Sequence, residues 1–410
     1  MPAKKKILCV AYGGGHVNMI VPVAHALRAN PEYDVTVLGL TTAGTVLERE
    51  GIPHIGFRDL VREDDRRALE IGERLAEGLS NPAVPHAETV AYLGLSYQDL
   101  IEKHGEAEAA RLYEEKNRRA FLPTTVFKRL YEEMQPDFVV ATNSPRAERA
   151  ALMTASKMNI PSVCIVDSFA LIEYEWIREN DYATKICVWL DSIKDFLVGK
   201  GRNADDILVT GNPAYDFLAQ EDLAPQAQAL RRQKGWGDRK VILWASQFLP
   251  AVHPRTGKAG DSDLPRKVDA RLFELLERHP DWQLVLRLHP SETRPVDALP
   301  DRAEFSPLAD DLNVLLKACD AVVSFTSTVG VKGMLLGVPF ITLDFSVYAE
   351  DAPFSKLGLA RGVENLDDLE TVLTEVLKEQ WKPAVSLPHF GRATENILGV
   401  IASILNRGNS

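Results

Sequence analysis

Short apolar runs alternate with amphipathic segments along most of this 410-residue chain, and this alternation limits the folds that it can adopt. A short apolar run suits a strand buried on both faces, and apolar residues at helical spacing suit a helix packed on a sheet. Strands that alternate with helices form parallel sheets. We predict strands at residues 7–11, 34–40, 52–57, 136–142, 161–166, 185–190 and 207–210, and later at 241–246, 283–288, 321–325 and 339–344.

The first strand runs directly into Gly13, Gly14, Gly15 and His16, which open a helix through Leu27. Glycines let backbone N–H groups approach an anion, and a helix N-terminus carries roughly half a positive charge. We therefore expect this turn to bind a phosphate group or an oxyanion. The spacing lacks the G-x-G-x-x-G fingerprint of dinucleotide binding, and no acidic residue clearly ends the second strand. A purely structural glycine turn is the alternative.

The chain is longer than one hydrophobic core usually supports, so we predict two domains. A polar stretch at 217–238 interrupts the alternation, and we place the domains at 1–217 and 218–387. A C-terminal helix at 388–405 is long enough to pack back on the first domain. Charged, helix-favouring sequence at about 60–134 predicts a helical insertion in the first domain, either an acceptor pocket or lid or a solvated decoration.

Composition argues against several partners. The net charge is −11 without a long basic block, which disfavours nucleic acid, and no apolar stretch approaches the length of a transmembrane segment. The four cysteines lie in apolar runs without C-x-x-C spacing, which predicts buried reduced thiols and a cytoplasmic location. Scattered carboxylates and the lack of Asp-x-Asp predict no metal, and no cofactor is expected.

Polar residues follow two predicted strands of the first domain. Asn143 ends one strand, and Asp167 and Ser168 end another. Ligands gather outside the carboxyl ends of parallel strands, so these residues are candidates for the acceptor side of a site. Helix capping is the alternative interpretation.

Four motifs in order resemble one family. They are Gly15-His16, Gly211-Asn212-Pro213, Arg287-Leu288-His289-Pro290, and Ser324 to Thr328 followed by Gly337-Val338-Pro339. Together, and over nearly the whole chain, they resemble nucleotide-sugar glycosyltransferases of the GT-B fold, related to UDP-N-acetylglucosamine 2-epimerases and to Kdo, sialic acid and glycerophosphate transferases. The resemblance implies an α/β fold with two Rossmann-like domains and a cleft between them.

The resemblance also implies roles for residues. The first domain would take the acceptor, with His16 as general base, although a packed or capping histidine is the alternative. The second domain would bind the donor, whose phosphate charge grows as the glycosidic bond breaks and must meet fixed hydrogen-bond donors. The candidate donor-binding residues are Gly211, Asn212, Ser246, Arg287, His289, Ser324, Ser327, Thr328 and Lys332.

Lys332 departs from the family pattern, in which an acidic residue at this position binds the ribose hydroxyls. A lysine cannot accept those hydrogen bonds. Either the ribose is held by other groups, or Lys332 meets a phosphate or carboxylate of the donor, or it is a solvated lysine. The choice between a UDP-type and a CMP-type donor stays open.

Three functions compete at this stage. The first is a metal-independent glycosyltransferase in glycan biosynthesis, acting on a small-molecule or glycan acceptor. The second is a non-hydrolysing UDP-N-acetylglucosamine 2-epimerase, although Thr142-Asn143-Ser144 and Val166-Asp167-Ser168 stand where the epimerase motifs would be. The third is a non-catalytic sugar-nucleotide-binding protein. The sequence leaves a homodimer open.

Overall fold

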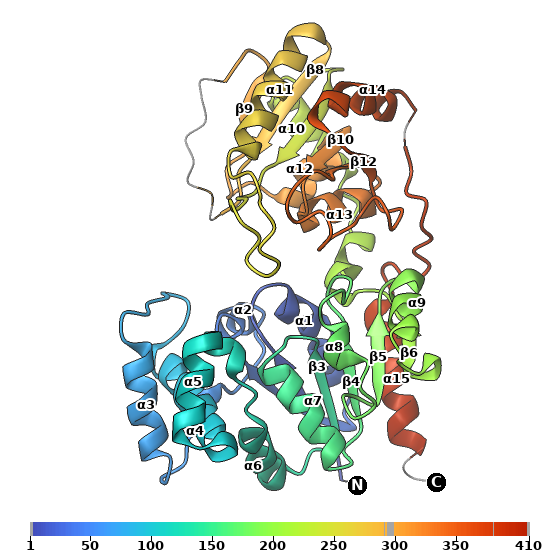
Figure 1. The fold of residues 1–410 in the computed structure, drawn as a ribbon. Coiled ribbons are helices and arrows are strands. Elements are labelled where there is room, and N and C mark those ends of the chain that lie inside the picture. The colour runs from blue at the N-terminus through green and yellow to red at the C-terminus, as the bar shows by residue number, and fades with distance from the viewer. Residues whose placement is uncertain (1–2, 291, 293–298, 380, 408–410) are drawn as a thin grey trace. The chain divides into compact units, whose positions relative to one another are not determined.

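The computed structural model describes residues 3–290, 292, 299–379 and 381–407 (Figure 1). The chain divides into two compact units. Unit 1 comprises residues 1–216 and 387–410, and unit 2 comprises residues 217–386. Each unit contains a six-stranded sheet in which every described strand pair is parallel. This confirms the predicted α/β architecture of two Rossmann-like halves.

The unit 1 sheet has the strand order β2-β1-β3-β4-β5-β6. Its central strands are buried on both faces, as their unbroken apolar runs require. In the register, Ile7 of β1 pairs with Val35 of β2 and with Phe138 of β3. The strands are β1 (Lys5–Ala11), β2 (Tyr33–Gly39), β3 (Phe138–Thr142), β4 (Ser162–Ile165), β5 (Lys185–Val188) and β6 (Ile207–Val209).

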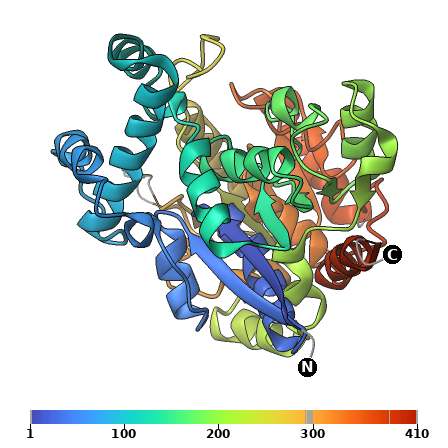
Figure 2. The same cartoon turned by 90° about the horizontal axis from the view of Figure 1, so that it is seen from below.

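Helices surround this sheet, and four of them form the insertion that the sequence predicts between β2 and β3. Figures 1 and 2 show α3, α4 and α5 grouped at one side of unit 1. The helices of unit 1 are α1 (Gly15–Ala29), α2 (Ala43–Arg49), α3 (Arg66–Ala76), α4 (His86–His104), α5 (Glu106–Lys116), α6 (Thr124–Met134), α7 (Ala147–Lys157), α8 (Tyr174–Ile177), α9 (Asp191–Gly199) and α15 (Ala393–Arg407).

The C-terminal helix α15 packs on unit 1. Ile397 and Ile401 are fully buried in the same hydrophobic core as α1 and the sheet. The carboxylate of Asp216 accepts hydrogen bonds from the backbone N–H groups of Ala393 and Thr394, at 3.0 and 2.7 Å. These bonds satisfy two of the donors that a helix N-terminus leaves unpaired, and the negative charge suits the helix dipole.

The predicted strand at 52–57 is wrong. Ile55 forms only an isolated bridge to Leu38, and a 3-10 helix begins at Phe57. Pro53 has no backbone N–H to give to a ladder, and the carboxylate of Glu88 accepts from Phe57 N–H and Arg58 N–H. The backbone therefore leaves the sheet edge after one bridge.

The unit 2 sheet has the strand order β12-β11-β10-β7-β8-β9. The strands are β7 (Lys240–Ala245), β8 (Trp282–Arg287), β9 (Ala303–Phe305), β10 (Ala321–Ser324), β11 (Phe340–Leu343) and β12 (Arg361–Val363). The helices are α10 (Ala224–Gln233), α11 (Leu264–Arg278), α12 (Leu312–Ala318), α13 (Thr328–Leu335) and α14 (Leu369–Glu379). The sequence analysis predicted neither β9 nor β12, and α10 lies inside the stretch taken as polar linker.

The core of unit 2 contains an aromatic pair, Trp244 of β7 and Phe325, which directly follows β10. Trp244 and Phe325 are fully buried and meet edge to face, with ring centroids 5.3 Å apart. The Trp244 indole N–H donates to Asp269 of α11 at 2.8 Å. At the contact between α13 and β11, a Cβ at Gly330 would lie 2.1 Å from the Phe340 ring, so only glycine lets α13 lie this close to β11.

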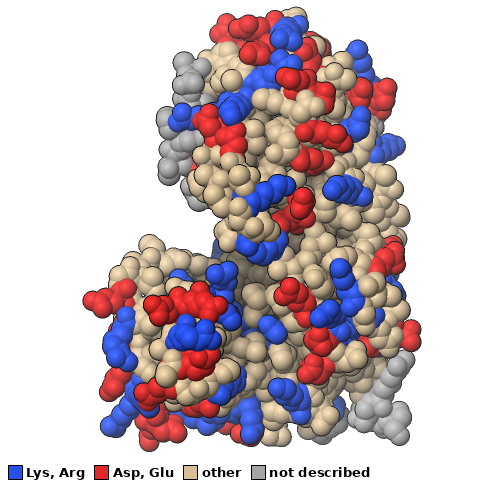
Figure 3. Space-filling model, viewed as in Figure 1, with Lys and Arg blue, Asp and Glu red and all other residues tan. Residues whose placement is uncertain are grey.

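Charged side chains are spread over the surface. Figure 3 shows lysines and arginines interspersed with aspartates and glutamates on both units, over the face in view. No helix in the described part of the chain is long and apolar enough to cross a membrane.

The four cysteines are free and buried. Burial raises the pKa of Cys9 and Cys187 to about 12 and also raises the pKa of Cys164 and Cys319. The thiolate is the reactive form, so we expect none of these thiols to react with a disulfide reagent in the folded protein at neutral pH. All four should react once denaturant unfolds the chain. Stoichiometric labelling of the native protein would contradict the burial.

Candidate functional site

Each sheet reverses the direction of its strand order at one place. In unit 1 the reversal lies between β1 and β3, and in unit 2 it lies between β7 and β10. Ligands of open α/β sheets bind at such switch points, outside the carboxyl ends of the strands. The segments that follow these four strands are therefore the first places to look for functional side chains.

The glycine turn follows β1 at the unit 1 switch point. A Cβ at Gly13 would lie 1.8 Å from the Thr42 hydroxyl, and Gly14 has a φ of 71°, so both positions require glycine. No side chain caps the N-terminus of α1, and its first turn holds no acidic residue. Among the described residues, no side-chain hydrogen bond caps this turn, so it presents backbone donors and the positive end of a helix dipole.

His16 lies in the first turn of α1 and reaches across the switch point. Its Nδ1 is 2.8 Å from the hydroxyl of Thr142, the last residue of β3. The Thr142 hydroxyl donates to Oε1 of Glu148 in α7, also at 2.8 Å, and the Tyr12 N–H donates to the same oxygen. Thr142 and Glu148 are fully buried, whereas His16 is half-buried. The Thr142 hydroxyl therefore connects the fully buried carboxylate of Glu148 with the imidazole of His16.

The predicted residues after β3 and β4 hold the neighbouring loop. The Asn143 side-chain oxygen accepts from Asp167 N–H at 2.7 Å, and Ser168 N–H bonds to the Asp167 carboxylate. Ser168 has a φ of 49°, a conformation that costs energy for a serine. A Cβ at Gly15 would lie 3.3 Å from Asp167 Oδ2, so this carboxylate borders the glycine turn. Asn143 therefore shapes the loop, and Asp167 lies next to Gly15, the residue before His16.

Glu173 is a candidate that the sequence analysis missed. Burial raises the pKa of its carboxyl, the charge of Asp167 raises it further, and His16 acts in the opposite direction. A carboxyl with a raised pKa close to an imidazole and a second carboxylate is a common feature of acid–base sites. Glu173 lies just before the four-residue helix α8, in a segment without a periodic signal.

A cavity of about 440 Å³ adjoins the glycine turn. One wall is the turn itself with Thr41 and Thr42, and the opposite wall comes from the helical insertion. The hydroxyl of Tyr92, a 5% exposed residue of α4, has no hydrogen-bond partner in the described part of the chain. The lining residues are Tyr12, Gly13, Gly14, Thr41, Thr42, Leu79, Ser80, Asn81, Val84, Glu88, Thr89, Tyr92, Leu93 and Arg118.

At the switch point of unit 2, Gln247 joins the ends of β7 and β10. Its amide donates to the Thr326 hydroxyl at 2.9 Å and accepts from Thr326 N–H at 3.0 Å. Ser246 is buried, and its hydroxyl donates to Glu292 at 3.0 Å. The hydroxyl of Ser324 is buried without a partner among the described residues. The donor-binding roles predicted for Ser246 and Ser324 from their positions stay predictions, and Gln247 was not among the predicted residues.

Ser327 is the N-cap of α13, and its hydroxyl accepts from Val329 N–H at 3.2 Å. The hydroxyl proton stays available to a ligand, because accepting that bond uses only an oxygen lone pair. Thr328 is exposed in the first position of the helix. Two hydroxyls and a helix N-terminus thus lie together at the switch point, as an anion site requires.

Arg287 and His289 differ in their surroundings. The Arg287 guanidinium donates to the Ser306 hydroxyl at 2.9 Å and to carbonyl groups of Pro307, Leu308 and Asp310. It therefore braces the loop that precedes α12. His289 is exposed, and its backbone N–H donates to Glu292. The donor-binding roles of both residues stay predictions.

Lys332 lies on α13, one turn after Ser327. Its side chain is partly buried, and burial lowers the pKa of its ammonium group. No hydrogen bond or ion pair links this side chain to another described residue. The partial burial of the side chain disfavours a fully solvated lysine. A partly buried lysine without an anionic partner among the described residues suits an anion that comes from a ligand.

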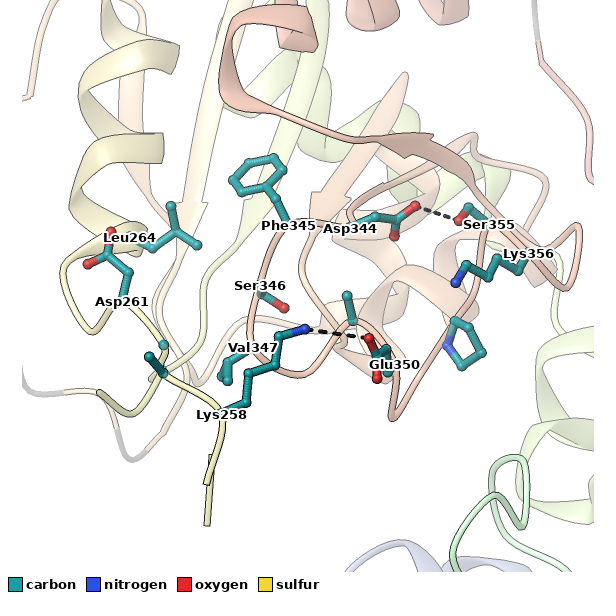
Figure 4. Close-up of a pocket in the computed structure, with 14 residues that line it drawn as sticks. Lys258, Asp261, Leu264, Asp344, Phe345, Ser346, Val347, Glu350, Ser355 and Lys356 are labelled. Atoms are coloured by element: carbon teal, nitrogen blue, oxygen red, sulfur yellow. Dashed lines mark hydrogen bonds and ion pairs between the residues drawn. The ribbon is translucent and has the colours of Figure 1, made fainter. Parts of the chain in front are cut away.

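A second cavity, also of about 440 Å³, opens beyond β11 (Figure 4). Burial raises the pKa of Asp344, although the Ser355 hydroxyl donates to its carboxylate. Ser346 is 5% exposed, and its hydroxyl has no partner in the described ranges. Lys258 and Glu350 form an ion pair between the two segments that line the cavity. Sequence analysis singled out none of these residues.

Gly211 and Asn212 belong to unit 1 and have structural contacts. Gly211 has a φ of 88°, and a Cβ there would lie 2.9 Å from both Ala393 Cβ and the His389 carbonyl. The Asn212 side chain accepts from Ala214 N–H at 2.9 Å. These contacts hold the segment beside α15, and the predicted donor-binding role of both residues has no further support.

Comparison with solved structures identifies the fold. The UDP-GlcNAc 2-epimerase of Neisseria meningitidis, solved with UDP-GlcNAc, is 14% identical and superposes with a TM-score of 0.61 over 97% of this chain and 100% of its own. The glycotransferase of kitacinnamycin is 13% identical, with a TM-score of 0.52 over 99% of this chain and 96% of its own. This chain has a GT-B-type fold.

A curated relative of this GT-B protein is a UDP-N-acetylglucosamine–N-acetylmuramyl-(pentapeptide) pyrophosphoryl-undecaprenol N-acetylglucosamine transferase of Exiguobacterium sibiricum. It is 24% identical over 300 residues, which cover 69% of this chain and 75% of the relative. No family model matches the chain. Within the described residues, no group of three or more His, Cys, Asp or Glu side chains could hold a metal ion.

Proposed function

We propose that this protein is a glycosyltransferase that moves a sugar from a nucleotide-activated donor to a hydroxyl group of an acceptor. Unit 1 supplies the acceptor side with His16 as general base, and unit 2 supplies the donor side. Protein hydrogen-bond donors, rather than a metal ion, are assigned to the phosphate charge. The relatives support an enzyme of sugar nucleotides, since both the transferase and the epimerases are named for such substrates.

The observation that carries this proposal is the setting of His16. The imidazole lies at the unit 1 switch point, beside an uncapped helix N-terminus and close to a cavity large enough for a small ligand. An imidazole can take a proton from an alcohol near neutral pH. We assign the acceptor to this cavity. The Tyr92 hydroxyl, which has no hydrogen-bond partner among the described residues, offers a polar contact there, and Leu93 offers an apolar one.

The donor is assigned to the carboxyl edge of the unit 2 sheet. The hydroxyls of Ser327 and Thr328 and the N-terminus of α13 suit a phosphate, and Lys332 offers a cation that pairs with no anion in the described part of the chain. In the neighbouring cavity, the Asp344 carboxylate and the Ser346 hydroxyl suit sugar hydroxyls. Charge that develops on the leaving phosphate would then meet fixed donors.

An epimerase is the second candidate. Inverting a carbon of the sugar requires an acid and a base on the substrate, and Asp167 with Glu173 offers a carboxyl pair in which burial raises the pKa of Glu173. Several solved structures of this fold are UDP-GlcNAc 2-epimerases. This pair favours a reaction on the donor alone, without an acceptor.

Thermal unfolding with UDP, CMP, CDP, GDP and TDP tests the donor site. A ligand at 100 times its Kd stabilises the folded protein by about 2.7 kcal/mol, so one nucleotide should raise Tm clearly above the others. The shift in Tm should persist when a chelator is present, because the phosphate is assigned to hydrogen-bond donors of the protein and not to a metal ion. It should disappear in the Ser327→Ala variant, which lacks one of these donors. The lack of any shift across the panel would contradict a sugar-nucleotide function of either kind.

A further inference from the structure

Three side chains from separate elements form a continuous chain of hydrogen bonds that ends at His16. Glu148 comes from α7, Thr142 ends β3, and His16 lies in the first turn of α1. The two links between these side chains are both 2.8 Å long. Glu148 is fully buried, and its second oxygen, Oε2, has no partner in the described part of the chain.

Counting protons fixes the direction of this chain. The Tyr12 N–H can only donate, so Glu148 Oε1 accepts from it, and the Thr142 hydroxyl donates to the same oxygen. The Thr142 hydroxyl has a single proton and gives it to Glu148. Thr142 must then accept from His16, so Nδ1 of the imidazole carries the proton and Nε2 presents its lone pair.

We propose that Glu148 and Thr142 are positioning residues that hold His16 in the tautomer of a base and favour the imidazolium that forms during transfer. The inference rests on the proposed function for its catalytic meaning. In the reaction, Nε2 takes the proton of the acceptor hydroxyl while that oxygen bonds to the anomeric carbon. The bond from this carbon to the donor phosphate oxygen breaks, and its electron pair leaves with the phosphate.

The buried carboxylate acts on the imidazole through one hydroxyl. A negative charge in a poorly solvated place stabilises a positive charge near it more strongly than it could in water. The other titratable groups near His16 are Tyr12, whose ring meets the imidazole edge on at 6.4 Å, and the carboxyls of Asp167 and Glu173. The Arg146 guanidinium lies over the Tyr12 ring, 5.1 Å from the ring centroid.

If Glu148 had only a structural role, Glu148→Gln would leave the titration of His16 unchanged, whereas the proposal predicts a change. The glutamine carbonyl can still accept from Tyr12 N–H and Thr142, so the fold and the tautomer should survive while the negative charge is lost. The imidazolium should then form less readily than in the wild type, so Glu148→Gln should lower the titration midpoint of His16. Thr142→Val removes the link to His16 at nearly constant volume, and Thr142→Ser keeps the hydroxyl.

The test is nitrogen NMR of protein labelled with ¹⁵N-histidine, with the His16 signals assigned by their loss in His16→Gln. We expect the Nδ1–H tautomer in the wild type and in Thr142→Ser, a mixture in Thr142→Val, and the lowered midpoint in Glu148→Gln. An Nε2–H tautomer in the wild type, or an unchanged midpoint in Glu148→Gln, would overturn the proposal. The measurement needs no turnover, so the expected tautomer in a protein without transferase activity would refute the proposed function alone.

Discussion

Replacing His16 with alanine is expected to lower kcat for sugar transfer on the order of 10²-fold or more. The base acts on the acceptor in the transition state, whereas the donor is assigned to the other unit. Nucleotide affinity should therefore stay nearly unchanged. Steady-state kinetics together with calorimetric titration of the nucleotide separate the two effects.

His25→Ala is the matched control, because His25 lies exposed on the same helix, away from the switch point. It should leave both kcat and affinity unchanged. If His16→Ala kept full turnover, His16 would be a packed or capping residue and the base would have to be sought elsewhere, with Glu173 as the first candidate.

Reversing the charge at Lys332 is expected to weaken donor binding tenfold to about a hundredfold at low salt, because a charge-assisted hydrogen bond to the donor is replaced by repulsion. Lys332→Met should lose the attraction without the repulsion and fall between wild type and Lys332→Glu. Added salt should narrow the gap between the variants, since it screens both effects. Calorimetric titration of UDP and CMP at two salt concentrations measures this.

The matched control for charge is Lys378→Glu, an exposed lysine of α14. It should bind both nucleotides as the wild type does. If Lys332→Glu instead improved UDP binding, the glutamate would be accepting ribose hydroxyls, and Lys332 would have no anionic partner in the donor. Equal affinities in all variants would remove Lys332 from the donor site.

The sequence predicted the sheets well where strands are long and buried. The strands β1, β3, β7 and β8 have unbroken apolar runs, and each was confirmed within a few residues at its ends. The strands β9 and β12 have only three residues each and include the polar Glu304 and Arg361, so no periodic signal marks them. Pro53 explains the opposite error, an apolar run that forms no strand.

The residues of the candidate site also differ in how well the sequence predicts them. The glycine turn, His16 and the hydroxyls before α13 stand out in the sequence, because a turn between a strand and a helix has a recognisable composition. Glu148 does not, since it looks like an ordinary charged residue of a helix. Only the fold places Thr142 within 2.8 Å of both Glu148 and His16, across 126 residues of chain in the second case.

The same reasoning explains why Gln247 and Ser346 were missed. Neither lies in a motif, and each acquires a possible role only from a partner or a cavity formed by distant segments. Lys332 shows the reverse case, because the sequence marked it as unusual. Only the structure shows that it is partly buried and has no anionic partner among the residues described.

The central claim is tested most directly by proton NMR that follows a nucleotide sugar in D₂O while the enzyme converts it. With a hydroxyl-bearing acceptor present, a transferase releases the nucleotide and forms a new glycosidic anomeric signal, while the hydrogen on sugar carbon 2 is retained. We predict this result, and we predict its loss in His16→Ala. Exchange of that hydrogen for deuterium without any acceptor, which inversion at carbon 2 requires, would contradict the transferase and identify an epimerase.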